Sequence, residues 1–172
     1  MSGSRRRTAA ELRKQRNHRG HQCWGHLIAA PLWVSFEANL GTLLRTCDAV
    51  GACMAVPRTA HYKAALGRGD TLHRRPHMHW ADGGAVRWIE RERNRGAHIV
   101  AVELADDAIP LPLLEPARQR TVVLLGLERH GVPDDAWELI DDVVQIPMVG
   151  RGSSLNVAVA GSLVLYRLAA MA

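Results

Sequence analysis

The chain has 172 residues, of which 47% are hydrophobic and 23% are charged, and its formal net charge is +5. A chain of this length and composition can bury a normal core without disulfides or structural metals, so we expect one main domain. We expect no membrane-spanning segment, because the longest apolar stretches are interrupted by charge or are too short to cross a bilayer.

The positive charge is concentrated at the N-terminus, in a segment that we call the basic arm (residues 1–25). Residues 1–20 hold seven Lys or Arg and one Glu, a net charge of +6, so the other 152 residues sum to −1. Such a run either binds nucleic-acid phosphates or is a solvated tail, and the sequence leaves both readings open. The residues predicted to contact phosphates are Arg5, Arg6, Arg7, Arg13, Lys14, Arg16 and Arg19.

The use of cysteine indicates a reducing compartment. The chain has three cysteines, an odd number, and Cys47 and Cys53 lie in apolar-periodic contexts. With no apolar run after the charged N-terminus, this pattern predicts free thiols and a cytoplasmic protein. His21, Cys23 and His26 have the chemistry of zinc ligands, but no second Cys/His pair stands at a finger-like distance, so we expect no metal.

Apolar runs alternate with helix signals over residues 26–172. The predicted strands are 27–34, 52–56, 77–80, 98–104, 121–127 and 142–148, with 77–80 at an edge of the sheet. The predicted helices are 40–50, a short one within 57–77, 84–95, one that begins at Pro133, and 154–171. Asn39, Asp82 and the pair Ser153 and Ser154 are the expected N-caps. Alternating strands and helices predict an α/β domain with a mostly parallel sheet.

The last strand and the last helix are joined by a glycine-rich loop, Gly150-Arg151-Gly152. A strand, a glycine turn and a helix N-terminus with free N–H groups are suited to bind a polar ligand. Taken alone, this segment is more typical of an ordinary strand–turn–helix connection.

Two further segments carry related patterns. The three patterns are Asn39-x-Gly41-x-x-x-Arg45, then Gly126-x-Glu128-x-x-Gly131, then Ile146-Pro147-Met148-x-Gly150 with Ser154-Leu155-Asn156-Val157. Together and in this order they resemble the three motifs of the SpoU/TrmH-type RNA methyltransferases of the SPOUT (α/β-knot) superfamily, over roughly residues 26–170. The resemblance implies a homodimer that uses S-adenosylmethionine to methylate a ribose 2′-hydroxyl in RNA. It also implies a deep trefoil knot at the C-terminal helix.

The resemblance also implies roles for single residues. Arg45 stands at the position of the family's catalytic arginine and is expected to reach the cofactor loop of the other subunit. Since a guanidinium normally stays protonated, we expect it to hold a phosphate and ease hydroxyl ionisation, and its use as a base stays open. The other residues implied at the catalytic centre are Asn39, Glu128, Ser154 and Asn156. Those expected at the cofactor are Val102, Glu103, Leu125, Gly126, Gly131, Ile146, Met148, Gly150 and Leu155, with the glycines letting the ligand approach the main chain.

The substrate and the class of function have alternatives. Short family members without an added RNA-binding domain resemble tRNA methyltransferases, so we expect tRNA and assign RNA contact to the basic arm. Ribosomal RNA, including a resistance-type methylation, stays open. A non-catalytic RNA-binding module with the same fold is a further reading, as is methylation of a base nitrogen, against which the Ser154-Leu155-Asn156 sequence argues.

Overall fold

The structure is a computed structural model that describes residues 26–69 and 76–171. The basic arm lies outside the described residues, as do His21 and Cys23. The phosphate-contact predictions that fall there are Arg5, Arg6, Arg7, Arg13, Lys14, Arg16 and Arg19. Within the described ranges, no helix combines the length and apolar character needed to cross a membrane.

Seven strands form one sheet, and every pair of neighbours is parallel. The order across the sheet is β3-β2-β1-β6-β4-β7-β5. The strands are β1 (Leu27–Ala30), β2 (Cys53–Pro57), β3 (Met78–Ala81), β4 (His98–Val102), β5 (Ile109–Pro110), β6 (Thr121–Leu124) and β7 (Asp142–Gln145). The predicted parallel α/β sheet is confirmed, and so is the edge position of β3. The two-residue strand β5 is not among the strands predicted from the sequence.

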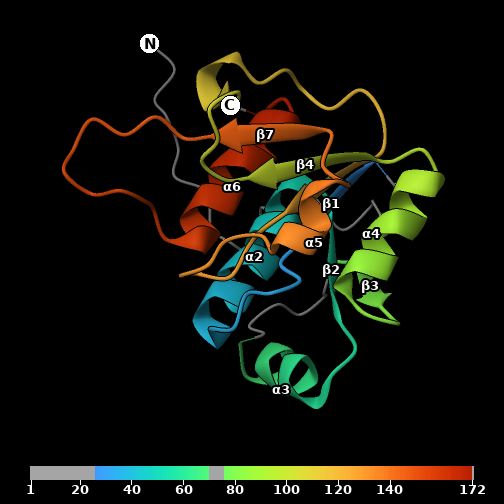
Figure 1. Cartoon of the computed structure of the whole chain (residues 1–172). Coiled ribbons are helices and arrows are strands. Elements are labelled where there is room, and N and C mark those ends of the chain that lie inside the picture. The colour runs from blue at the N-terminus through green and yellow to red at the C-terminus, as the bar shows by residue number, and fades with distance from the viewer. Residues whose placement is uncertain (1–25, 70–75, 172) are drawn as a thin grey trace, which may run out of the picture.

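Helices cover both faces of this sheet (Figure 1). They are α2 (Glu37–Val50), α3 (Ala60–Gly69), α4 (Ala85–Asn94), the short 3-10 helix η1 (Leu111–Leu113), α5 (Asp134–Trp137) and α6 (Val157–Leu168). Helices α2, α3 and α6 pack on one face, and α4 and α5 pack on the other. Because strand side chains point alternately to the two faces, Leu27 and Ala29 of β1 enter the first core, whereas Ile28 and Ala30 enter the second.

Four predicted strands are too long at their carboxyl ends. Strand β1 stops at Ala30 instead of residue 34, because Pro31 has no N–H with which to continue the ladder. Strands β4, β6 and β7 stop two or three residues before the predicted ends at 104, 127 and 148. The apolar residues beyond these ends line a cavity instead: Leu104, Leu127, Ile146 and Met148.

The prediction that Asn39 caps its helix is wrong. Helix α2 begins at Glu37, its N-cap is Phe36, and no side chain caps it. Asn39 lies inside the first turn and is 7% exposed, with its amide bonded to two other side chains. The Asn39 amide does form hydrogen bonds, as expected of a capping residue type, but its partners are side chains of distant segments and not the backbone at the helix end.

Two other predicted caps are also wrong. Helix α6 starts three residues after Ser154, and its cap is Asn156, whose Oδ1 accepts from the N–H of Ala158 at 2.9 Å and of Val159 at 3.3 Å. Gly84, not Asp82, is the N-cap of α4. The Asp82 carboxylate instead forms an ion pair with Arg58.

Candidate active site

The loops after three neighbouring strands of the sheet surround a cavity of about 690 Å³. These strands are β6, β4 and β7, and the start of α2 closes the cavity from the side of β1. Since all strands are parallel, their carboxyl ends lie at one edge, where open α/β sheets commonly bind ligands. The volume is that of a site for a small organic molecule.

Most of the predicted site residues line this cavity. They include four of the five residues implied at the catalytic centre, namely Asn39, Glu128, Ser154 and Asn156. They also include seven of the nine expected at the cofactor: Val102, Glu103, Gly126, Gly131, Ile146, Met148 and Leu155. The folded chain thus brings all three sequence patterns, which lie up to 117 positions apart, to one place.

A chain of side-chain hydrogen bonds joins the three patterns. The Asn39 amide nitrogen donates to Glu128 Oε1 at 2.9 Å, and the Asn156 amide nitrogen donates to Asn39 Oδ1 at 2.9 Å. Glu128 also accepts from the backbone N–H groups of Ser35 and Phe36 at 3.4 and 3.3 Å. One amide therefore holds the loop after β6 and the start of α6 at the same time.

The Glu128 carboxylate is held in its ionised form. Partial burial raises the pKa of this carboxyl, but bonds from its own N–H, from Asn39, Phe36 and Ser35 outweigh that effect and bring the net pKa below the ordinary value. A carboxylate with a low pKa that already accepts several hydrogen bonds is a weak base. Glu128 is therefore suited to hold the loops in position.

The glycines of the loop after β6 are required by the loop itself. An added Cβ at Gly126 would lie 2.2 Å from the carbonyl carbon of Gly131, and Gly131 has φ +69°. A Cβ at Gly131 would lie 2.5 Å from Oε1 of Glu103. Packing alone therefore requires glycine at both positions, and approach of a ligand to the main chain there stays a prediction.

Glu103 supports the same loop from the end of β4. Its Oε1 accepts from the N–H of Val132 at 2.8 Å. Burial raises the pKa of Glu103, although bonds from Val132 and Leu104 act in the opposite direction. Within one chain, this carboxyl contacts the loop that shapes the cavity.

Three predicted site residues do not line the cavity. Leu125 is fully buried, with its side chain against Gly161 of α6. Gly150 lies between the lining residues Met148 and Ser153 but is not itself in the lining, and an added Cβ there would meet nothing within 4 Å. Arg45 is exposed and lies six residues after Asn39 in α2, which is about 9 Å along the axis and about 120° around it. Arg45 therefore lies on a different side of α2 from Asn39 and is not among the residues that line the cavity.

Several lining residues are missing from the sequence prediction. They are Phe36, Leu104, Leu127, Arg129, His130, Ser153 and Val157. All of them except Phe36 are next to a predicted residue in the sequence, and Phe36 lies three residues before Asn39. Arg129 and His130 lie inside the second pattern, so their basic side chains were a signal that the sequence already offered.

Comparison with known proteins identifies relatives of the chain. The family model described as the SpoU rRNA Methylase family matches residues 33–166. A tRNA (guanosine(18)-2′-O)-methyltransferase of Thermus thermophilus is 33% identical over 140 residues, covering 74% of this chain and 66% of the relative. A 23S rRNA (uridine(2479)-2′-O)-methyltransferase of Streptomyces viridochromogenes is 34% identical over 139 residues, covering 74% of this chain and 47% of the relative. The chain thus spans less than two thirds of either.

A solved structure has the same fold. The crystal structure of a TrmH/SpoU tRNA modifying enzyme from A. aeolicus superimposes with a TM-score of 0.69 and 25% sequence identity. The superposition covers 95% of this chain and 84% of that chain. The fold of the chain is therefore a known architecture.

Proposed function

The chain belongs to the SpoU rRNA methylase family, and we propose that it transfers a methyl group from S-adenosylmethionine to a ribose 2′-hydroxyl in RNA. The observation that carries this proposal is the hydrogen-bonded chain Asn156–Asn39–Glu128, which joins the three family patterns around one cavity. An ordinary glycine loop or an ordinary polar cluster would not need these three distant segments to be hydrogen-bonded to one another.

The cavity suits the cofactor in size and lining. Its volume of about 690 Å³ fits a ligand of nucleoside size, and Ile146, Met148 and Leu155 offer apolar surface to an adenosyl group. S-adenosylmethionine, when bound, supplies an activated methyl group. The loops after β4, β6 and β7 hold it through backbone groups and these side chains, and fix its orientation toward the RNA.

Arg45 supplies the charge for the acceptor side of the reaction. A 2′-hydroxyl is a poor nucleophile until it loses its proton, and a protonated guanidinium stabilises the developing negative charge. The same planar group binds the phosphate beside the target ribose. Glu128 and Asn39 act as positioning residues that fix the loops, because the carboxylate is already engaged.

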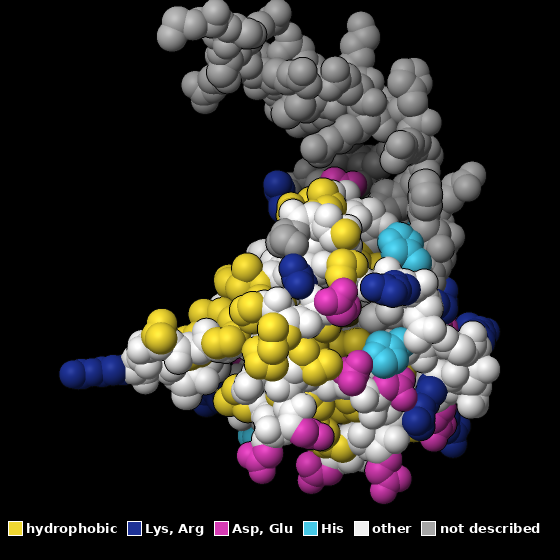
Figure 2. All heavy atoms as spheres, turned by 90° about the horizontal axis from the view of Figure 1, so that it is seen from above, with side chains coloured by type: hydrophobic (Ala, Val, Ile, Leu, Met, Phe, Trp, Pro, Cys, Tyr) yellow, Lys and Arg dark blue, Asp and Glu magenta, His cyan; other side chains and the backbone are white. Residues whose placement is uncertain are grey.

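We propose that the working unit is a homodimer with composite sites. Arg45 does not line the cavity of its own chain, so in a single chain the cavity lacks its expected arginine. Val159 and Leu163 of α6 are 46% and 42% exposed and, four residues apart, lie on one face of the helix. Figure 2 shows hydrophobic side chains side by side on the molecular surface. A two-fold contact through α6 covers apolar surface and brings each Arg45 toward the other chain's cavity.

The proposed substrate is tRNA. The relative from Thermus thermophilus, which is named for methylation of a tRNA guanosine, supports this choice, and the basic arm adds a net charge of +6 for phosphate binding. Ribosomal RNA is the second candidate, and the Streptomyces viridochromogenes relative favours it. Both substrates present the same ribose hydroxyl to the site.

Two further features are proposed with the family assignment. The first is a deep trefoil knot, in which the C-terminal helix passes under the preceding loop. In support, the backbone N–H of Ala117 donates to the Leu168 carbonyl at 2.9 Å, and the Arg167 side chain donates to the Leu114 carbonyl. These bonds fasten the end of α6 to the segment before β6.

The second is that the protein acts in the cytoplasm, in keeping with Cys47 and Cys53, which form no disulfide within the described part of the chain.

Transfer of a labelled methyl group from S-adenosylmethionine to purified tRNA and to ribosomal RNA tests the proposed activity. Labelling of either RNA by the wild-type protein, and none by the Arg45→Ala variant, supports it. Calorimetry with S-adenosylmethionine tests the alternative that the protein is a non-catalytic RNA-binding module. A non-catalytic module should give no heat of cofactor binding.

A further inference from the structure

A second cluster of reactive side chains lies at the opposite edge of the sheet from the cavity. Cys53 is the first residue of β2, His77 immediately precedes β3, and His79 lies in β3. These are the amino ends of two parallel strands, whereas the cavity is built on carboxyl ends. The cluster therefore takes no part in the site described above.

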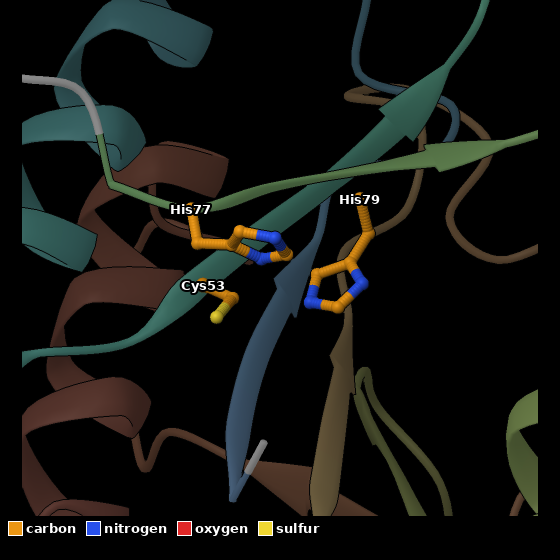
Figure 3. Close-up of side chains that lie close together, drawn as sticks. All are labelled: Cys53, His77 and His79. Carbon is orange, nitrogen blue, oxygen red and sulfur yellow. The ribbon is translucent and has the colours of Figure 1, made fainter. Parts of the chain in front are cut away.

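The sheet register brings the three side chains to one face. β2 and β3 are parallel, with Ala55 opposite His79, so Cys53 stands opposite His77 and diagonal to His79. The N–H of Met54 donates to the His77 carbonyl at 3.0 Å, which continues the pairing to this end. Residues two apart in a strand share a face, and Figure 3 shows the thiol and the two imidazoles close together beside these strands.

The spacing of the donor atoms fits one metal ion after a small adjustment. The Cys53 sulfur and one nitrogen of each imidazole all lie within 4.8 Å of one another. In a tetrahedral zinc site, ligand atoms bonded at about 2.0 to 2.3 Å are separated by about 3.3 to 3.6 Å. Because the His77 side chain is exposed, rotation of that imidazole can close the gap without moving the core.

The ligand types and their surroundings suit a transition metal. A thiolate with two imidazoles selects zinc and related ions, and not magnesium or calcium. Cys53 is buried, His79 is half-buried and His77 is exposed, so the cluster lies at the boundary between the core and the solvent. The two rings meet edge to face, with centroids 4.7 Å apart.

We propose that Cys53, His77 and His79 bind one Zn²⁺ ion, with a water molecule in the fourth position. On binding, the Cys53 S–H bond breaks, its proton goes to the solvent, and the sulfur bonds to the ion. The ion links the edge strand β3 to β2. Its role is to fasten a strand that, among the strands the structure describes, pairs with β2 alone.

The sequence expectation of no metal missed this cluster for a clear reason. Cys53 and His77 are 24 positions apart, which matches no zinc-finger spacing, and only the register of β2 and β3 joins them. The group that the spacing did draw attention to, with His21 and Cys23, lies largely outside the described residues. Any experiment must therefore tell the two groups apart.

The test uses the full chain, stripped with a chelator and titrated with zinc by calorimetry and with cobalt(II) by absorption. We expect one equivalent of metal, a thiolate-to-cobalt charge-transfer band, and release of a proton whose heat depends on the buffer. Cys53→Ser and His79→Ala each weaken binding by at least about tenfold, because each removes a ligand. The matched control is a Cys23→Ser protein that also carries His21→Ala, which binds like the wild type.

The exposed His77 keeps the test independent of folding. His77→Ala leaves the core untouched and is also expected to weaken binding at least about tenfold, with an unchanged circular dichroism spectrum. Zinc raises the melting temperature of the wild type but not that of this variant. Three results overturn the proposal: no binding at micromolar zinc, equal binding by wild type and His77→Ala, or loss of binding in the Cys23→Ser control.

Discussion

The Asn156 side chain donates a hydrogen bond from Nδ2 to Oδ1 of Asn39 over 2.9 Å, and this bond ties the start of α6 to the first turn of α2. Asn39 in turn donates to Glu128, so the position of each loop around the cavity depends on the others. Asn156 also caps α6 through its own Oδ1. The two roles use different atoms of one amide and can be separated by substitution.

Replacing Asn156 separates capping from positioning. Asn156→Ala removes both and should lower the free energy of unfolding by about 1 kcal/mol, the usual value of an N-cap. Asn156→Asp keeps an oxygen for the cap but has no N–H for Asn39, so it should retain most of the stability yet lose methyl transfer. Urea unfolding and initial rates measure the two effects. Wild-type activity in Asn156→Asp would show that the bond to Asn39 is dispensable.

The Glu128 carboxylate should make stability depend on acid pH. Its pKa is lower in the folded protein than in the unfolded chain, so the stabilisation is present above the unfolded value of about 4.3 and is lost as the pH falls through the folded pKa. Glu128→Gln should therefore be less stable at neutral pH, by no more than about 1 kcal/mol because the group is partly solvated.

Urea unfolding over a pH series checks this expectation for Glu128. The wild-type and Glu128→Gln curves should approach each other below about pH 4, where the wild-type carboxyl takes up its proton. The exposed Glu115 provides a matched control, since Glu115→Gln should give the wild-type curve. A constant difference between wild type and Glu128→Gln at every pH would contradict the ionic origin of the effect.

Gly161 should tolerate no side chain. A Cβ there would lie 2.7 Å from Cδ1 of Leu125 and 2.9 Å from Cδ2 of Leu43, so Gly161→Ala should cost about 1 to 3 kcal/mol through overpacking. Gly67 is a matched control in α3, because a Cβ there meets nothing within 4 Å. Gly67→Ala should stabilise the protein by about 0.5 to 1 kcal/mol. Thermal unfolding distinguishes the signs, and equal effects at both positions would refute the packing argument.

Mixing two inactive variants tests whether Arg45 acts in the partner's site. Arg45→Ala alone should lower kcat at least tenfold. Gly126→Trp should abolish cofactor binding, because a side chain at position 126 collides with the backbone of Gly131 and displaces the loop that lines the cavity. Heterodimers of the two variants regain one complete site, so the mixture should recover activity. Each variant alone is the control. A mixture that stays inactive despite proven subunit exchange would contradict composite sites.

The sheet could be predicted from local patterns, whereas most of the cavity residues were implied by the resemblance of three segments to the SpoU/TrmH motifs. Buried strands read as apolar runs, and the site residues cluster within three short segments. The errors lie where tertiary contacts compete with local signals. Asn39 has the residue type of a cap, but Glu128 and Asn156 bind its amide. Leu104 was predicted to end a strand, but it lines the cavity. An apolar side chain can contact either a core or a ligand, so its type alone does not distinguish the two places.

Juxtapositions set by sheet register lay outside what the sequence alone can predict. Cys53 and His79 meet because β2 and β3 pair in one register, and a shift by one residue would point His79 to the other face. The start of α2 likewise depends on tertiary contacts. That start moved by three residues from the prediction, since Phe36 and not Asn39 precedes the helix.

Methylation of a ribose 2′-hydroxyl is tested by locating the transferred methyl group on the RNA. RNA that has accepted labelled methyl groups is digested with a nuclease that needs a free 2′-hydroxyl, and the products are separated and sequenced. For the wild type we predict label in a nuclease-resistant dinucleotide, at a single nucleotide of tRNA. For Arg45→Ala we predict no label. Label on a base nitrogen, or no transfer to tRNA or ribosomal RNA by a protein that is folded and binds the cofactor, would contradict it.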